Sequence, residues 1–258
     1  MNAPNSLPKV QAPHVPLTDY YPSEQERQAF LRRIFDDTAV DYDRIESLLA
    51  WGTGSRYRRQ ALIRSGLQPG MKVLDVGVGT GLVAAQACIL TGDPALVAGV
   101  DPSPGMMAAS KLPKAMVLKE GRAESLPFPD SHFDFLSMGY ALRHISDLGM
   151  AFTEFERVLK PGGRLCILEI TRARSPLGQW LLRGYMRGAV PILTRFVSRQ
   201  KNTATIWRYY WDTIEACVPP EQVMGALRAA GLAQVNQHVE LGIFSEYQAV
   251  KAGPAQPA

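Results

Sequence analysis

The chain has 258 residues, 46% of them hydrophobic, which suits one α/β domain with additions or at most two small domains. The net charge of +4 is mild, and the cysteines and histidines are scattered without metal-ligand spacing, so we predict reduced cysteines, a cytoplasmic protein and no metal site. A signal peptide and a long charge-free apolar run are both missing, which argues against secretion and against a membrane span.

Residues 1–22 are rich in proline and poor in large apolar groups, which predicts a disordered or extended arm. Ser23 with Glu26 three residues later is typical of a capping box and predicts a helix start. Further helical pieces are predicted near 42–51 and 56–65. The helical segment 23–66 could cover one face of a sheet, or it could form a lid over a ligand.

The stretch 72–81, read KVLDVGVGTG, organises the rest of the chain. Its first half predicts a buried strand, and its second half places Gly77, Gly79 and Gly81 at alternate positions before a predicted helix. A strand, a glycine turn and a helix form the first unit of a nucleotide-binding α/β fold. Glycines let the backbone approach a ligand closely, and the helix start offers unpaired N–H groups to it.

The glycine spacing narrows the type of ligand. A dinucleotide fingerprint reads G-x-G-x-x-G, whereas this chain reads G-x-G-x-G, with Asp75 before it. Asp101 closes the next predicted strand, where an acid can bind both hydroxyls of a ribose. An ordinary tight turn would explain the glycines alone, but it would not explain an acid at the end of the next strand, where Asp101 lies. We therefore predict a site for a nucleoside-containing ligand.

Strands and helices alternate through the predicted core, 67–170, which indicates a parallel sheet with right-handed crossovers. The strands predicted after the glycine turn cover residues 96–100, 116–118, 133–138 and 165–170. Segment 220–252 predicts a helix followed by two strands, which are close enough in sequence to pair only as an antiparallel hairpin.

The insertion between these parts, 171–219, has an unusual charge pattern. From Thr171 to Trp211 it has no acidic residue, and large apolar residues alternate with basic ones. The basic residues are Arg172, Arg174, Arg183, Arg187, Arg195, Arg199, Lys201 and Arg208. Such a segment predicts contact with an anionic membrane surface or a substrate pocket, although a solvated basic face over a core helix is the alternative. Nucleic acid is a weaker alternative, because no binding motif accompanies the charge.

Together, these motifs resemble the class I S-adenosylmethionine-dependent methyltransferases, and among them the ubiquinone/menaquinone biosynthesis C-methyltransferases. The resemblance runs from about Phe35 to Val250. It is carried by residues 35–43, 73–81, 99–101, 123–130, 133–134, 141–147 and 157–165. It implies a Rossmann-like α/β fold whose seven-stranded, mostly parallel sheet has an antiparallel C-terminal hairpin and helices on both faces.

The resemblance also implies how S-adenosylmethionine is held. Its methionine tail would be cradled by Asp75, Gly77, Gly79, Thr80 and Gly81. The adenosine side would be formed by Asp101, Pro102, Met106, Arg122, Ala123 and Glu124. Gly139 would lie beneath the sulfonium, and Tyr42 would close over the tail unless it is only a packed aromatic.

The acceptor side is predicted at Tyr140, Arg143 and His144. A phenol ring attacks through carbon only once its hydroxyl loses a proton, so a base and a cation are expected. His144 fits the role of the base, and Arg143 fits the role of the cation. The alternative for His144 is a surface histidine that caps the loop before the helix, and the alternative for Arg143 is a salt bridge that orders that loop. Tyr140 could line the ring pocket or simply pack. This chain departs from the family at His144 and Glu46, where asparagine is usual, and at Gly139, where serine is usual.

These observations predict methyl transfer to an aromatic or quinol-like small molecule, at a ring carbon. O- or N-methylation of a soluble aromatic metabolite is the alternative within the enzymes. A protein of this fold that binds the cofactor without transferring a methyl group is the alternative of another class. The expected location is cytoplasmic, at the periphery of a membrane if the basic segment meets lipid, and a homo-oligomer is compatible with the sequence.

Overall fold

The computed structural model describes residues 12–49, 52–173, 175–190 and 203–253 of the chain. The described residues form one seven-stranded sheet in the order β3-β2-β1-β4-β5-β7-β6. The strands are β1 (Val73–Val76), β2 (Val97–Asp101), β3 (Val117–Glu120), β4 (Phe133–Gly139), β5 (Leu159–Ile170), β6 (Leu232–Glu240) and β7 (Phe244–Lys251). Strands β1 to β5 are parallel, and β7 runs antiparallel to both β5 and β6. This confirms the predicted fold.

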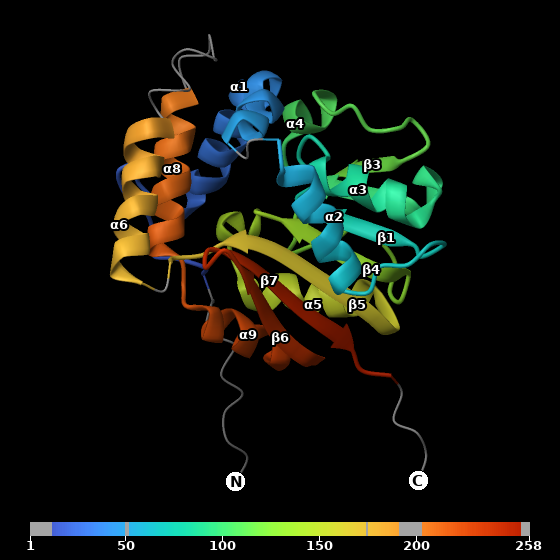
Figure 1. Cartoon of the computed structure of the whole chain (residues 1–258). Coiled ribbons are helices and arrows are strands. Elements are labelled where there is room, and N and C mark those ends of the chain that lie inside the picture. Colours follow the sequence, from blue (N-terminus) through green and yellow to red (C-terminus); the bar gives the residue numbers. More distant parts are fainter. Residues whose placement is uncertain (1–11, 50–51, 174, 191–202, 254–258) are drawn as a thin grey trace, which may run out of the picture.

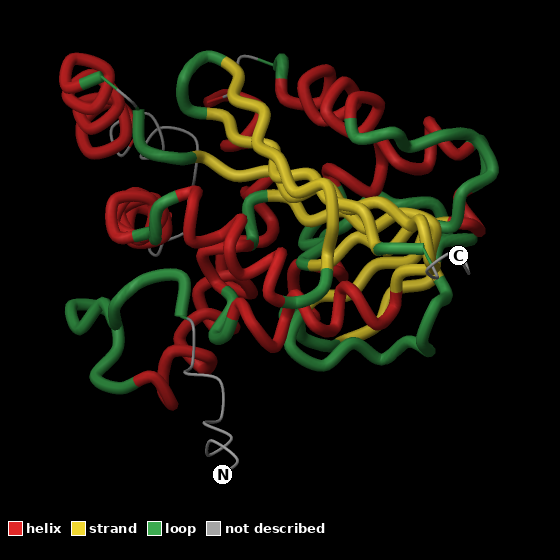
Figure 2. The backbone as a smooth tube through the Cα atoms, turned by 90° about the horizontal axis from the view of Figure 1, so that it is seen from below, coloured by secondary structure: helices red, strands yellow, loops and turns green. Residues whose placement is uncertain are grey.

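Helices cover both faces of the twisted sheet (Figures 1 and 2). The helices of the described residues are α1 (Glu24–Leu49), α2 (Gly54–Arg64), α3 (Leu82–Thr91), α4 (Pro104–Ala108), α5 (Leu148–Val158), α6 (Pro176–Gly184), α8 (Thr203–Ala216) and α9 (Pro220–Ala229). Two short 3-10 helices, η1 (Pro94–Leu96) and η2 (Leu142–His144), and one π-helical segment, η3 (Tyr185–Ala189), accompany them. One apolar core joins the sheet to α5 and α9, and a second joins it to α2 and α3. Strands β1 and β2 are buried along their whole length, as expected of parallel strands covered on both faces.

Helix α1 is one continuous helix, so the prediction of two separate helical pieces is wrong. No glycine or proline lies between Glu24 and Leu49, and the first glycine, Gly52, follows the helix with φ +71°. At the other end, the Ser23 hydroxyl accepts a hydrogen bond from the Glu26 N–H at 3.4 Å, as the capping motif predicts.

Helix α5 ends earlier than the sequence predicts. Its last residue is Val158, and Leu159 already pairs with Phe133 as the first residue of β5. The segment 161–163 therefore lies inside β5, where a register shift beside Phe133 and a φ of +79° at Gly162 accommodate it.

The described part of the N-terminal arm, residues 12–22, has bends and a turn and packs against the domain. His14 and Tyr21 are buried, and the Val218 N–H donates to the Pro13 carbonyl at 2.7 Å. A few apolar and polar anchors therefore hold this proline-rich segment in place, whereas the sequence predicts a disordered or extended arm.

Helices α1 and α8 form a cap beyond the ends of the central strands (Figure 1). A third apolar cluster holds this cap together, with Ile34 of α1 packed among Trp207 and Tyr210 of α8 and Met186 of η3. Of the predicted basic residues in this part of the chain, Arg174, Arg195, Arg199 and Lys201 lie outside the described residues. Within the described residues, no helix is long and apolar enough to cross a membrane.

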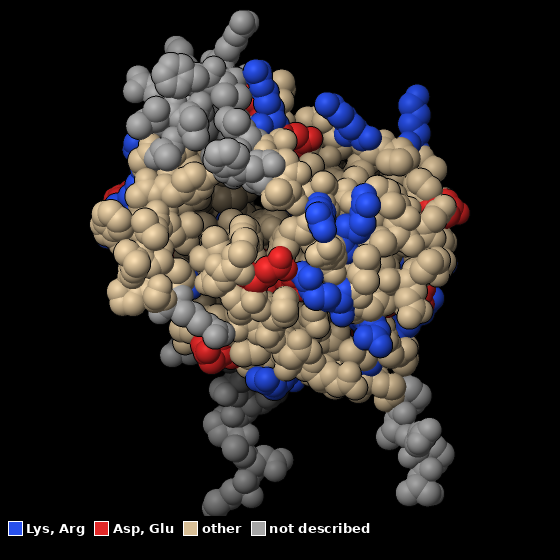
Figure 3. Space-filling model, viewed as in Figure 1, with Lys and Arg blue, Asp and Glu red and all other residues tan. Residues whose placement is uncertain are grey.

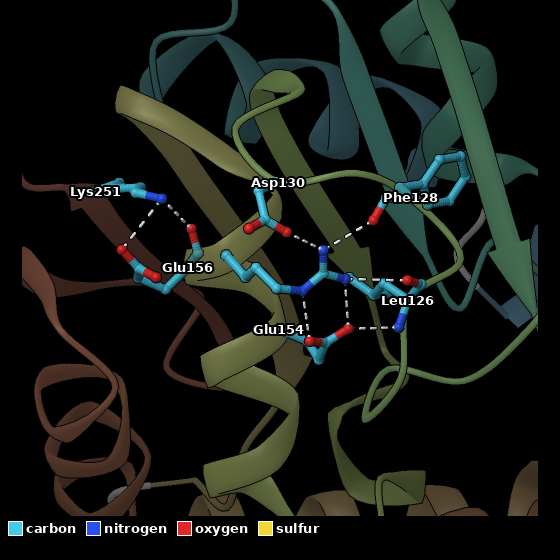
Figure 4. A network of polar contacts seen from close by, with 7 residues as sticks. Leu126, Phe128, Asp130, Glu154, Glu156 and Lys251 are labelled. Carbon is cyan, nitrogen blue, oxygen red and sulfur yellow. Dashed lines mark hydrogen bonds and ion pairs between the residues drawn. The ribbon is translucent and has the colours of Figure 1, made fainter.

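A polar network fixes the loop between β3 and β4 (Figure 4). The Arg157 guanidinium donates to the carbonyls of Leu126 and Phe128 at 3.1 and 2.9 Å and pairs with Asp130 and Glu154 at 2.6 and 2.7 Å. Glu154 also accepts the Leu126 N–H at 2.7 Å. The network holds in place the loop whose first residues border the cavity described next.

Candidate active site

A cavity of about 690 Å³ opens at the carboxyl ends of β1, β2 and β4, beneath α1 and α2. The strand order reverses between β1 and β4, which is where open α/β sheets bind ligands. The predicted residues that line the cavity are Tyr42, Asp75, Gly77, Gly79, Thr80, Asp101, Pro102, Met106, Arg122, Ala123, Glu124, Gly139, Tyr140 and His144. Gly81 and Arg143 are not among the lining residues.

The glycine loop forms the floor of one end of the cavity. The N–H groups of Gly77 and Val78 donate to the Val100 carbonyl at 2.8 and 3.0 Å, so the loop is tied to β2. Gly77 has φ +68°, and a Cβ there would stand 2.6 Å from the Cβ of Ala141. Only glycine fits this turn without strain. Gly81, with φ +93°, precedes the first residue of α3 and shapes the turn from outside the cavity.

Two acids flank the glycine loop on the methionine side of the predicted cofactor site. Asp75 is 1% exposed and accepts a hydrogen bond from the Ser137 hydroxyl at 2.7 Å. Burial raises the pKa of Asp75 to about 7, against the opposing effect of the Ser137 hydrogen bond. Asp43 of α1 accepts a hydrogen bond from the Thr80 hydroxyl and so ties the helical cap to the loop.

Asp101 stands at the tip of β2. Its two carboxylate oxygens accept the N–H groups of Gly79 and Ser103, each at 2.8 Å. A carboxylate has about four acceptor positions, so both oxygens can still accept hydroxyls from a ribose. Burial raises the pKa of Asp101 to about 6, and the two N–H groups oppose this rise.

Replacement of Asp101 by alanine should weaken binding of S-adenosylmethionine by about 1.5–3 kcal/mol, the usual scale for a hydrogen bond to a charged group. Because the wild-type carboxyl takes up a proton below a pKa of about 6, wild-type affinity should also fall as the pH drops through that value. The part of that fall that Asp101 causes should be missing in the variant. Isothermal titration at several pH values measures both effects, and an affinity unchanged by the substitution would remove Asp101 from the site.

Helix α1 also holds the adenosine side, a contact that the sequence did not predict. The Asp36 carboxylate accepts the Ser103 hydroxyl at 2.5 Å and the Gly105 N–H at 2.9 Å. Across the cavity, Glu124 pairs with Arg122 at 3.1 Å and accepts the Ser146 N–H at 2.6 Å. These side chains fix the loops at this end of the cavity.

Aromatic side chains gather at the other end. The hydroxyls of Tyr42 and Tyr210 lie 2.6 Å apart, and the Tyr42 ring is stacked with Trp207 at 6.4 Å between centroids. Tyr140 follows Gly139 with φ +58°, which is unusual for a tyrosine and is the kind of strain found at functional sites. A Cβ on Gly139 would stand 2.5 Å from a Val83 methyl, so a serine would fit poorly there in this chain.

His144 lies on the wall of this aromatic end. Its ring is 5.2 Å from Phe35 and 5.6 Å from both Tyr209 and Tyr210, between centroids. Both ring nitrogens are buried and find no hydrogen-bond partner among the described residues. Burial, with the nearby positive charges of Arg143 and Arg27, lowers the pKa of His144 well below 6.5. The imidazole is therefore neutral at neutral pH and able to accept a proton.

Arg143 lies behind the cavity wall, which disagrees with the expectation that it faces the acceptor. Its guanidinium is fully buried, forms an ion pair with Glu169 and donates to the Thr213 hydroxyl at 3.1 Å. Its carbonyl accepts a hydrogen bond from Arg27 at 2.9 Å. Arg143 thus orders the turn that presents His144, which was the alternative reading of this residue.

Two further cavity residues, Arg58 and Tyr210, escaped the sequence prediction. Arg58 is 4% exposed and lines the cavity, although it belongs to a strongly basic helix with no visible motif. Tyr210 lies at the end of the basic segment, where we predicted a substrate pocket, but nothing marked this tyrosine out from its neighbours.

One group of described residues outside the cavity has metal-ligand chemistry. His238, Glu240 and Glu246 bring their ligand atoms together on the β6–β7 hairpin. Arg64 pairs with Glu240 and Glu246 at 2.9 and 2.5 Å, so the two carboxylates already have a cation between them.

The glycine loop is too short for a dinucleotide fingerprint, yet it ends beside an acid at the tip of β2, so it fits a single nucleoside that carries a polar tail. With this strand order, that combination is typical of the class I S-adenosylmethionine-dependent methyltransferase fold. The chain belongs to the ubiE/COQ5 methyltransferase family, which matches residues 23–251. S-adenosylmethionine is therefore its cofactor, and the residues around the glycine loop and Asp101 fit it.

Two relatives illustrate the family. The chain is 30% identical to the demethylmenaquinone methyltransferase of Symbiobacterium thermophilum, with 83% of this chain and 89% of that protein covered. It is 33% identical to the 2-phytyl-1,4-naphtoquinone methyltransferase of Synechococcus elongatus, with 81% and 90% covered.

The fold is shared more widely than the chemistry. The solved structure of the cyclase SpnF superposes with a TM-score of 0.60 at 18% identity, and the match covers 88% of this chain and 96% of that one. The fold alone would therefore leave methyl transfer open, and the family match decides it.

Proposed function

We propose that the protein transfers the methyl group of S-adenosylmethionine to a ring carbon of a quinol-like aromatic acceptor. The observation that carries this proposal is the neutral, unpartnered imidazole of His144 on the wall of the same cavity that holds the cofactor residues. Two relatives named for menaquinone and naphthoquinone substrates support this acceptor class.

The shape of the aromatic end suits a flat ring. Phe35, Tyr42, Tyr140 and Tyr210 line it together with His144. Aromatic groups favour offset or edge-on contact with another ring, and their hydroxyls can fix the orientation of a polar ring substituent. A cavity of about 690 Å³ lies within the range of about 300–1,000 Å³ that is usual for small-molecule sites.

The bound cofactor supplies an electrophilic methyl group on a positively charged sulfur. His144 accepts the proton of an acceptor hydroxyl, which raises the electron density at the neighbouring ring carbon. S-adenosylmethionine, held by the glycine loop and Asp101, would supply the methyl group to that carbon and leave as a neutral thioether. The ring carbon would release its own hydrogen to water as a proton, which would restore the aromatic ring. The cavity walls hold the reacting atoms in line, an effect that can supply about 7–11 kcal/mol of the barrier.

A panel of hydroquinones, phenols and aromatic amines, offered with labelled S-adenosylmethionine, tests the proposal. Mass spectrometry with fragmentation should locate the label on ring carbon of a hydroquinone. Label only on oxygen or nitrogen of a soluble metabolite would favour the alternative of an O- or N-methyltransferase. Tight cofactor binding without any transfer would favour a protein that does not transfer methyl groups.

We further infer that α6 rests on an anionic lipid surface, where an acceptor with an apolar tail would be met. Leu177, Trp180 and Leu181 on α6 are 67%, 71% and 56% exposed, and none of the residues of this helix is buried. Figure 3 shows mainly uncharged surface where α6 lies. Exposed Arg172 and Arg183 flank these apolar residues, and α6 itself has no acid. Interfacial helices combine an apolar face with basic residues in this way.

Vesicle co-sedimentation tests this surface. The protein should bind vesicles that contain anionic lipid at low salt and release them at high salt, because each basic residue contributes only about 1 kcal/mol within a Debye length. Trp180→Glu should weaken binding strongly. Ile89→Glu is the matched control, because Ile89 of α3 is 56% exposed without belonging to α6. Equal binding by both variants, or none by the wild type, would contradict the inference.

A further inference from the structure

Arg58 is the one cation in α2 whose side chain is buried, at 4% exposure, although this helix carries several arginines. Its guanidinium reaches the wall of the cavity and lies 5.4 Å from the centroid of the Tyr140 ring. Burying an arginine is costly unless its charge and its donors are matched. The contacts of Arg58 therefore indicate what this charge is for.

Glu46 matches the charge of Arg58, but the protein satisfies the hydrogen-bond donors of its guanidinium only in part. Nη2 donates to Glu46 of α1 at 2.6 Å. Nε is buried and finds no partner among the described residues. A guanidinium offers its five N–H groups in a planar fork that matches a carboxylate. With one side of the fork held by Glu46, the orientation of the group is fixed and another side remains available for an anion.

The surroundings of Arg58 identify that anion. Burial is the largest influence on the pKa of Asp75 and raises it, while Arg58 is a smaller influence that lowers it, so the guanidinium beside Tyr140 is also within electrostatic reach of the acid beside the glycine loop. The acids beside the glycine loop there are Asp75 and, through Thr80, Asp43. A guanidinium with an unsatisfied donor next to acids complements a group that carries both charges, such as the ammonium and carboxylate of an amino acid.

We infer that Arg58 binds the carboxylate of the amino-acid end of S-adenosylmethionine, with Glu46 as the positioning residue that holds the guanidinium. The inference concerns how this chain holds its cofactor and does not depend on the identity of the acceptor. The resemblance assigns the methionine tail to Asp75 and the glycine loop, and Arg58 adds a positively charged contact from α2.

Two ligands separate this role from a structural one. S-adenosylhomocysteine carries the amino-acid end, whereas 5′-methylthioadenosine has the same nucleoside and sulfur without it. In titrations, Arg58→Ala should lose about 10- to 100-fold in affinity for S-adenosylhomocysteine, as expected for a charged hydrogen-bonded contact. Its affinity for 5′-methylthioadenosine should stay at the wild-type value. Binding of that second ligand also shows that the variant is folded.

Arg59→Ala is the matched control, because Arg59 is the next residue of α2, is exposed and donates to Gln86 instead. It should bind both ligands as the wild type does. Arg58→Lys should keep part of the preference for S-adenosylhomocysteine, since it retains the charge and loses the fork. An Arg58→Ala variant that loses equal affinity for both ligands, or for neither, would overturn the inference.

Glu46→Gln provides an independent check. Glutamine can still accept the hydrogen bond from Arg58 but no longer neutralises its charge. This variant should therefore keep the preference for S-adenosylhomocysteine over 5′-methylthioadenosine. If Glu46→Gln lost that preference while Arg58→Ala kept it, the pair would serve to join α1 to α2 and Arg58 would have no ligand of its own.

Discussion

Replacement of Gly79 by valine should abolish binding of S-adenosylmethionine while the domain still folds. Gly79 has φ +54° and lines the cavity, and a Cβ there would stand 3.3 Å from the terminal methyl of Met106. A branched side chain would extend further into the cavity at the carboxyl ends of β1 and β2, where the ligand binds. Titration with the cofactor should give no measurable heat, and circular dichroism should show the wild-type content of helix and strand.

Gly92 supplies the control for backbone strain. Gly92 has φ +81° at the end of α3, and a Cβ there would meet nothing within 4 Å. Gly92→Val should cost roughly the same 1–2 kcal/mol for a left-handed conformation, yet bind the cofactor normally. If Gly79→Val bound as tightly as Gly92→Val, the glycine loop would be a turn without a role in binding.

Replacement of His144 by alanine should lower kcat by about 10²–10⁴-fold, the usual contribution of a general base, and leave cofactor affinity unchanged. The imidazole lies among Phe35, Tyr209 and Tyr210, at the end of the cavity away from the glycine loop. His132→Ala is the control, because His132 packs on Phe133 at the opposite end of β4. Comparable losses of kcat in both variants would contradict the assignment.

The pH dependence of the rate distinguishes a base from a residue that only shapes the pocket. Because the pKa of His144 lies well below 6.5, wild-type enzyme should already have its base unprotonated at neutral pH. Its rate should therefore be nearly flat between about pH 7 and 9 and fall in acid. In His144→Ala the acceptor hydroxyl must ionise without help, so the rate should rise with pH across that range. Parallel profiles for the two proteins would leave His144 without a role in proton transfer.

Much of the cofactor site could be predicted from the sequence because it is local. The glycine loop and Asp101 each follow directly after a buried strand, and parallel strands bring their carboxyl ends to one edge. The contacts that Asp36 and Asp43 make were not predictable in this way. Both acids face loops far away in sequence, and only the packing of α1 brings them together.

The acceptor side shows where sequence reasoning fails. Arg143 and His144 are adjacent, and the pattern of residue types gives no indication of which side chain points into the cavity. The direction is decided by Glu169 and Thr213, which are distant in sequence and hold the guanidinium away from it. Removing one partner of a buried ion pair costs about 3–5 kcal/mol. An alanine at Arg143 would therefore report on folding before it reported on chemistry.

Helix α1 sets the distance between the two ends of the cofactor site. Asp36 bonds to the adenosine side and Asp43 to the glycine loop, and the two acids are seven residues apart (43 − 36 = 7). Seven residues are close to two full turns and about 10.5 Å along the axis, so both acids face the same way. One residue inserted between them would rotate one acid by about 100° relative to the other. The spacing between Asp36 and Asp43 is therefore fixed by the helix. Insertions or deletions can be accommodated only before Asp36 or after Asp43.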